Sequence, residues 1–173
     1  VAPLTSALAA GNRALLKPSE FVPETAALFA EVIPKYFSED EVAVVTGGEA
    51  ISQDFAELPF DHLFFTGSTR VGAHVMRSAA KNLVPVTLEL GGKSPVVIGR
   101  SAELDLAGTR LAFSKLMNGG QLCLSPDYVL VPNELEEQLI ARVVHEVQSM
   151  YPNITENADY AGVINERHFA RLQ

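Results

Sequence analysis

Short apolar runs alternate along this chain with longer segments in which apolar residues recur at helical spacing. The runs are rich in valine, leucine and phenylalanine, and several of them end at a glycine or at a lysine–proline pair. They occupy residues 14–16, 42–45, 63–66, 86–90, 95–98 and 128–131. We expect each run to form a strand, and the alternation predicts an α/β fold with a mostly parallel sheet.

The segments between these runs show the spacing of helices with one apolar face. Pro23 opens the first of them, Asp105 is expected to cap the third, and Pro152 lies beyond the end of the fourth. The last residues of the chain also have a helical pattern. The predicted helices cover residues 24–37, 71–81, 105–117 and 135–147.

The glycine pair Gly91-Gly92 separates two such alternating stretches, and we predict a domain boundary there, between residues 1–91 and 92–173. A chain of 173 residues with 47% hydrophobic content can build one core or two small ones. The chain starts without methionine inside an apolar pattern and ends inside a helical one. We therefore expect processed ends or a piece of a longer protein.

Charge and composition exclude several classes of function. The net charge is −8 and the basic residues are scattered, which makes binding to nucleic acid unfavourable. No apolar run is long enough to predict a membrane span. The four histidines lack metal-like spacing and one cysteine cannot form an internal disulfide, so we predict no metal site and a reducing, cytoplasmic setting.

Two residues at glycine-rich turns are candidates for catalysis. Cys123, the single cysteine, follows the flexible segment 118–122, where a thiolate nucleophile can face a pocket. Glu89 ends an apolar strand, and desolvation by apolar neighbours would suit a general base. The alternative for Glu89 is a carboxylate at a strand edge that faces water.

Two further segments are candidates for binding a nucleotide. Gly67, Ser68 and Gly72 lie between a strand and a helix, where a glycine turn and a helix N-terminus favour a pyrophosphate; a plain tight turn is the alternative. Lys17 and Glu20 follow a strand and could hold ribose hydroxyls, or belong to a solvated loop. The Rossmann glycine fingerprint is absent, and in the Gly67 loop Ala73 stands where a Walker motif needs lysine. Gly92-Lys93-Ser94 resembles the end of a Walker motif, but Thr87 stands in place of its first glycine.

Four stretches together resemble the aldehyde dehydrogenase family, in its order and spacing. They are Ala-Leu-Ala-Ala-Gly-Asn-Arg-Ala-Leu-Leu-Lys-Pro-Ser-Glu (7–20), Phe-Phe-Thr-Gly-Ser-Thr-Arg-Val-Gly (64–72), Leu-Glu-Leu-Gly-Gly-Lys-Ser-Pro (88–95) and Asn-Gly-Gly-Gln-Leu-Cys (118–123). The tracts around Glu89 and after Cys123 are most similar to the class 3 branch, which includes coniferyl-aldehyde, medium-chain and aromatic aldehyde enzymes. The resemblance covers essentially the whole chain as a central segment of such an enzyme.

The resemblance implies a three-layer, parallel-sheet α/β fold that is incomplete here. Residues 1–91 would be part of a Rossmann-like NAD(P)-binding domain, and residues 92–173 the start of the catalytic domain. It further implies a homodimer that oxidises an aldehyde to a carboxylic acid with NAD(P)⁺.

Residue roles follow from the same resemblance. Cys123 would attack the aldehyde to give a thiohemiacetal and then a thioester, and Glu89 would activate water for hydrolysis. Lys17 and Glu20 would hold the adenosine ribose, Gly67, Ser68 and Gly72 form the pyrophosphate turn, and Leu90 would line the nicotinamide side. The carboxylate of Glu20 would repel a 2′-phosphate, which favours NAD over NADP.

The sequence also departs from the family pattern. Glycine stands at position 119, where the family commonly has alanine or glutamine, and this suggests a looser cysteine loop. The asparagine-bearing motif before Val1 and the glutamate motif after Gln173 are not in the chain. A catalytically incompetent nucleotide-binding remnant and a cofactor-free thiol hydrolase are therefore the alternative functions.

Overall fold

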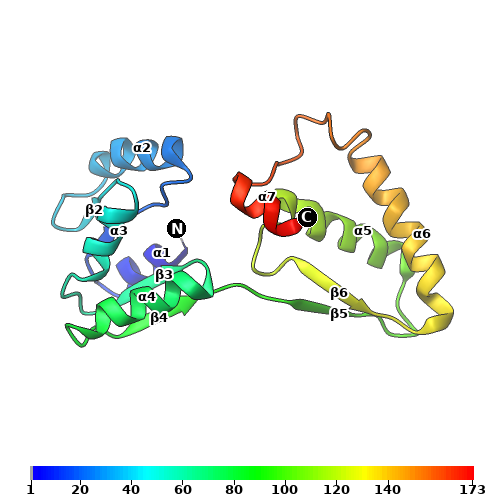
Figure 1. Cartoon of the computed structure of the whole chain (residues 1–173), viewed down its shortest axis with the longest axis horizontal. Helices are drawn as coiled ribbons and strands as arrows, with labels where there is room; N and C mark the ends of the chain where they lie inside the picture. Colours follow the sequence, from blue (N-terminus) through cyan, green and yellow to red (C-terminus); the bar gives the residue numbers. More distant parts are fainter. Residues whose placement is uncertain (1) are drawn as a thin grey trace. The chain divides into compact units, whose positions relative to one another are not determined.

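The structure of this protein is a computed structural model that describes residues 2–173 (Figure 1). The chain divides into two compact units, a first unit that ends at Leu90 and a second unit from Gly91 to Gln173. Each unit combines helices with parallel strand pairs, which confirms the α/β class.

The first unit contains two parallel strand pairs. Ala14 of β1 lies opposite Val42 of β2, and Leu63 of β3 lies opposite Val86 of β4. Parallel strands need a crossover connection, which the helices of this unit supply. Its elements are α1 (Ala2–Ala9), β1 (Ala14–Leu16), α2 (Pro23–Val32), η1 (Ile33–Lys35), β2 (Val42–Val44), α3 (Glu49–Ala56), β3 (Leu63–Thr66), α4 (Thr69–Ala80) and β4 (Val86–Glu89).

A small apolar core joins α4 to the β3–β4 pair. Leu63, Ala79 and Val84 are buried there, and Phe65 and Val75 pack against them. Helix α4 runs along the two strands (Figure 1). The packing fixes the turn between β3 and α4, which carries the candidate phosphate-binding residues.

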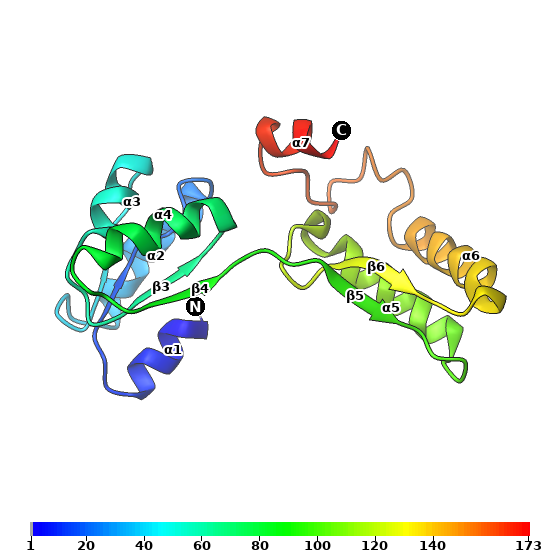
Figure 2. The ribbon, with the colours of Figure 1, turned by 60° about the horizontal axis from the view of Figure 1, so that its bottom comes forward.

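The second unit contains one parallel pair, β5–β6, with α5 as its crossover (Figure 2). Helix α6 packs on α5, and Ile98, Leu104, Leu111 and Leu139 form the buried core between strands and helices. The elements are β5 (Ser94–Val97), α5 (Leu104–Leu116), η2 (Met117–Gly120), β6 (Pro126–Leu130), α6 (Asn133–Met150) and α7 (Glu166–Leu172).

The structure contains every predicted strand but corrects two helix predictions. The helix predicted at 24–37 ends as an α-helix at Val32, because Pro34 has no N–H to donate to the Ala30 carbonyl, and the chain continues as the 3-10 helix η1. Asp105 is not the cap of α5. Glu103 occupies the N-cap position, and Asp105 lies in the first turn, where a negative charge is favourable.

Two short helices, α1 and α3, were not predicted from the sequence. Each has eight residues, and Pro3 inside α1 reads as an interruption although it falls in the first turn, where proline is tolerated. In α3 only two large apolar side chains, Ile51 and Phe55, are present, so the sequence shows a weak apolar face. Within residues 2–173, no helix is long and apolar enough to cross a membrane.

Candidate active site

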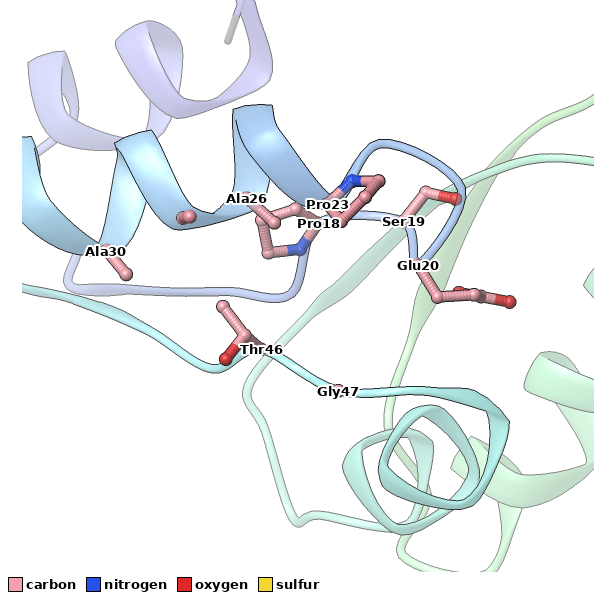
Figure 3. Close-up of a pocket in the computed structure, with 9 residues that line it drawn as sticks. Pro18, Ser19, Glu20, Pro23, Ala26, Ala30, Thr46 and Gly47 are labelled. Atoms are coloured by element: carbon pink, nitrogen blue, oxygen red, sulfur yellow. The ribbon is translucent and has the colours of Figure 1, made fainter. Parts of the chain in front are cut away.

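A pocket of about 330 Å³ opens in the first unit where β1 and β2 end. Figure 3 shows Pro18 between α2, which carries Ala26 and Ala30, and the segment with Thr46 and Gly47. Ser19, Glu20 and Thr46 form the polar part of the lining. The carboxyl ends of parallel strands are the usual place for a ligand in α/β proteins, and this pocket combines small apolar walls with a carboxylate.

Lys17 and Glu20 form an ion pair beside this pocket. The Lys17 side chain is only 9% exposed, and its Nζ lies 3.3 Å from Glu20 Oε2 and donates to the Pro18 carbonyl at 2.9 Å. A hydrogen bond from the backbone N–H of Glu20 lowers the pKa of its carboxyl group most, and Lys17 lowers it further against the effect of burial. Glu20 is therefore ionised at neutral pH.

Sequence reasoning identified Glu20 in this pocket but missed its apolar wall. Ala26 and Ala30 lie one helical turn apart on α2, so both face the pocket. A pair of alanines at this spacing, on the helix that follows a strand with a candidate ribose-binding loop, is the signal that could have identified the wall.

The glycine turn between β3 and α4 has the geometry of a capped helix N-terminus. Ser68 is the N-cap of α4, and its Oγ accepts a hydrogen bond from the Val71 N–H at 3.3 Å. The Gly67 N–H donates to the Glu89 carbonyl at 3.0 Å, which joins this turn to the end of β4. The turn therefore lies beside the last residue of β4.

Gly72 has a packing role in the structure. It is buried in α4, and a Cβ at this position would lie 2.8 Å from Leu90 Cδ2. The space left by the missing side chain is filled by Leu90, with Phe65 and Leu88 next to it. Gly72 therefore determines where Leu90 lies, and its part in a pyrophosphate-binding turn stays a prediction.

Glu89 is exposed at the end of β4, opposite Thr66. The expected desolvation by its apolar neighbours is not found, because alternation along the strand directs Leu88 and Leu90 away from the side of Glu89. Glu89 is therefore a carboxylate at a strand edge that faces water, which is the alternative interpretation of the sequence. An exposed carboxylate remains accessible to water, which is what a general base for hydrolysis must contact.

In the second unit, Cys123 lies exposed on a loop. Ser94 Oγ donates to the Cys123 carbonyl at 3.3 Å, and a Cβ on Gly92 would lie 2.5 Å from the same oxygen. The Ser125 N–H donates to the Leu122 carbonyl at 3.1 Å and closes a turn around the cysteine. The backbone of Cys123 is therefore held while its side chain is exposed.

Gly92 precedes β5 and Ser94 is its first residue. An ion pair also joins this part of the chain to β6. Lys93 Nζ lies 2.6 Å from Asp127 Oδ2. The Gly-Lys-Ser sequence, which is similar to the end of a Walker motif, therefore makes intramolecular contacts with the cysteine loop and β6. Among residues 2–173, no three His, Cys, Asp or Glu side chains converge on a potential metal site.

Gly119 has a structural requirement that contradicts the expectation of a looser loop. Its φ is +62°, and a Cβ would lie 2.7 Å from the Ala161 carbonyl oxygen. Asn118 and Gly120, on either side, also have positive φ, at 52° and 73°. Glycine at position 119 therefore allows the loop to approach the segment 161–164 closely.

Comparison with known proteins identifies the family of the chain. Residues 1–173 match the model of the aldehyde dehydrogenase family. The chain is 52% identical over 170 residues to a coniferyl aldehyde dehydrogenase of Pseudomonas sp. strain HR199, covering 98% of this chain and 35% of that protein. It is 47% identical over 172 residues to aldehyde dehydrogenase family 3 member A2 of Mus musculus, covering 99% of this chain and 36% of that protein.

Solved structures show the same relationship. A substrate-bound AldH of Staphylococcus aureus has a TM-score of 0.88 and 42% identity, covering 98% of this chain and 37% of that one. An aldehyde dehydrogenase of Mycobacterium tuberculosis complexed with NAD⁺ has a TM-score of 0.83 and 36% identity, covering 96% and 35%.

The chain belongs to the aldehyde dehydrogenase family. Its relatives include coniferyl aldehyde dehydrogenases and family 3 members, which confirms the predicted class 3-like branch. The chain spans about a third of the length of the curated relatives it matches.

The Gly119→Ala substitution should destabilise the second unit. A left-handed conformation costs a residue with a side chain about 1–2 kcal/mol, and the clash with the Ala161 carbonyl adds to this. We expect a free energy of unfolding lower by about 1–3 kcal/mol in urea titrations followed by circular dichroism. Gly99→Ala, where a Cβ meets open space, is the control. Equal unfolding midpoints for the two variants would contradict the role assigned to Gly119.

Proposed function

We propose that the whole protein oxidises an aromatic or medium-chain aldehyde to a carboxylic acid with NAD(P)⁺. The observation that carries this proposal is the exposed Cys123 side chain on a loop whose backbone is held by Gly92 and Ser94. The names of the coniferyl aldehyde relatives support an aromatic substrate. The first unit would hold the nucleotide and the second would carry the nucleophile.

The residues of the first unit fit the adenosine half of a nicotinamide dinucleotide. The apolar pocket wall formed by Ala26 and Ala30 suits a planar base, and Glu20 and Lys17 offer an acceptor and a donor to ribose hydroxyls. The N-terminus of α4 behind Ser68 offers backbone N–H groups to a pyrophosphate. When bound, NAD(P)⁺ accepts the hydride that the substrate carbon loses.

The chain's own contribution to oxidation centres on Cys123. Its sulfur, as thiolate, adds to the carbonyl carbon of the aldehyde and forms the oxyanion of a thiohemiacetal. Loss of hydride from that carbon leaves a thioester on Cys123. The fixed backbone at Cys123 favours this chemistry because an oriented nucleophile needs no further ordering when the substrate arrives.

Glu89 would complete the reaction by hydrolysis. As a carboxylate it takes a proton from water, and the resulting hydroxide adds to the thioester carbon. The carbon–sulfur bond then breaks, which releases the carboxylic acid and restores the Cys123 thiolate. The exposed position of Glu89 supports this role because water reaches the carboxylate.

The ionised Glu20 beside the pocket supports a preference for NAD over NADP. The carboxylate can accept a hydrogen bond from a ribose 2′-hydroxyl but repels a 2′-phosphate. Lys17 offsets part of that repulsion, because its Nζ is paired with the same carboxylate. We therefore propose NAD as the preferred cofactor with NADP as a weaker substitute.

Cys123→Ala should abolish aldehyde oxidation in the whole protein. Without the sulfur no thiohemiacetal forms, and we expect kcat to fall by about 10³-fold or more. The measurement is aldehyde-dependent NADH absorbance, with NAD binding by calorimetry as the control for an intact pocket. Unchanged turnover would refute the role of Cys123 as nucleophile.

The same measurements distinguish the two alternative functions. NAD binding without any turnover in the unsubstituted protein would favour the nucleotide-binding remnant. Undetectable NAD binding together with Cys123-dependent ester cleavage would favour the thiol hydrolase.

Glu89→Gln should separate oxidation from hydrolysis. An amide cannot take the proton from water, so the thioester accumulates after one fast turnover. We expect a burst of NADH close to one equivalent per site, followed by a steady rate reduced by about 10²-fold or more. Glu103→Gln, an exposed glutamate whose side chain makes no capping bond on α5, is the matched control. A normal steady rate in Glu89→Gln would contradict the assignment.

Glu20→Gln should change the cofactor preference. Removal of one unit charge at about 4 Å in water-like surroundings changes the interaction by about 1 kcal/mol, or about fivefold. The ratio of kcat/KM for NADP to that for NAD should therefore rise about fivefold. Glu39→Gln, an exposed glutamate outside the pocket, should leave the ratio unchanged. An equal ratio in both variants would show that Glu20 does not discriminate between the cofactors.

A further inference from the structure

We propose that Gln121 is a positioning residue, whose side-chain amide fastens the cysteine loop to the segment 161–164 and thereby orients Cys123. This inference rests on the proposed role of Cys123 as nucleophile. It concerns a residue two positions before the cysteine that sequence reasoning did not single out. Its support is a set of hydrogen bonds inside the second unit.

The amide of Gln121 joins two segments that are about forty residues apart in the sequence. Its Nε2 donates to the Asn118 carbonyl at 2.9 Å and to the Gly162 carbonyl at 3.0 Å. Its Oε1 accepts from the Ile164 N–H at 2.9 Å. All three partners are backbone groups of fixed polarity, so the reversed amide would oppose donor to donor and acceptor to acceptor. The contacts therefore define which way the amide points.

The loop that Gln121 closes has a conformation that needs support. Asn118, Gly119 and Gly120 are three consecutive residues with positive φ. The Asn118 carbonyl accepts both the Gln121 backbone N–H at 3.1 Å and the Gln121 side chain. Two donors from one residue thus hold the turn closed, while the close approach of Gly119 to Ala161 brings the segment 161–164 within reach.

Cys123 is held from both directions along the chain. On its N-terminal side, Gln121 joins the loop to Gly162 and Ile164. On its C-terminal side, the Cys123 carbonyl accepts a hydrogen bond from Ser94. Because the sulfur is attached to this short span, its position depends on both anchors. Loss of the upstream anchor should disorient the sulfur without removing it, which affects the reaction more than the binding of substrate.

The first test compares three variants of the whole protein in steady-state kinetics. Gln121→Met keeps the length of the side chain but removes all three hydrogen bonds, and Gln138→Met on the exposed face of α6 is the matched control. We expect Gln121→Met to lower kcat at least tenfold, with KM for aldehyde and NAD within about threefold. The third variant, Gln121→Glu, keeps the acceptor for Ile164 but loses both donors.

Gln121→Glu gives a signature that a structural role alone would not produce. Protonation of the introduced carboxyl group restores one donor, so kcat relative to the unsubstituted protein should rise as the pH falls from 8 to 6. For Gln121→Met, kcat relative to the unsubstituted protein should not change over this pH range. In hydrogen exchange, the Ile164 N–H should be less protected in Gln121→Met than in the unsubstituted protein, and Gln121→Glu should retain more of that protection.

Two results would overturn the proposal. One is a kcat for Gln121→Met equal to that of Gln138→Met. The other is a loss of activity in Gln121→Met that matches the loss of Cys123 thiols open to alkylation in the native protein. That result would mean that part of the protein is misfolded and that the sulfur of the folded part keeps its orientation. Should the unsubstituted protein show no aldehyde oxidation, the proposed function fails. Exchange at Ile164 and the alkylation rate of Cys123 then still decide whether Gln121 fastens the loop: unchanged values in Gln121→Met refute it.

Discussion

The parallel pairing of β5 with β6 is the constraint on which the position of Cys123 depends. A parallel pair requires the chain to return along α5, so the loop after α5 arrives beside the start of β5. Ser94 and Gly92 lie at that start and contact the Cys123 carbonyl. The cysteine loop is thus anchored by the strand that begins the second unit.

At three positions in the two units, the absence of a side chain on glycine allows a neighbouring group to approach the backbone closely. Gly92 admits the Cys123 carbonyl, Gly119 admits the Ala161 carbonyl, and Gly72 admits the Leu90 side chain. Each contact would be shorter than 3 Å to an added Cβ, so a larger residue would displace the neighbour that matters. These three glycines therefore act on the position of a neighbouring residue rather than on loop flexibility.

The two units divide the chemistry of the proposed reaction. The first has a pocket with an ionised carboxylate and a capped helix N-terminus, which are features that bind a nucleotide. The second has an exposed thiol on a fixed backbone, which is a feature that reacts. The proposed reaction would join the two in one activity, and the residues in each unit suit the part that the proposal assigns to them.

The sequence by itself determined the strands, the α/β class, the family and the candidate residues Cys123 and Glu20, because apolar periodicity and ordered motifs are local properties of a chain. It did not determine that Glu89 is exposed, that Gly72 serves Leu90, or that Gln121 reaches Gly162 and Ile164. These depend on which distant segments meet. Only the tertiary structure decides such contacts, since the same residue types at the same spacing are compatible with either outcome until the segments pack.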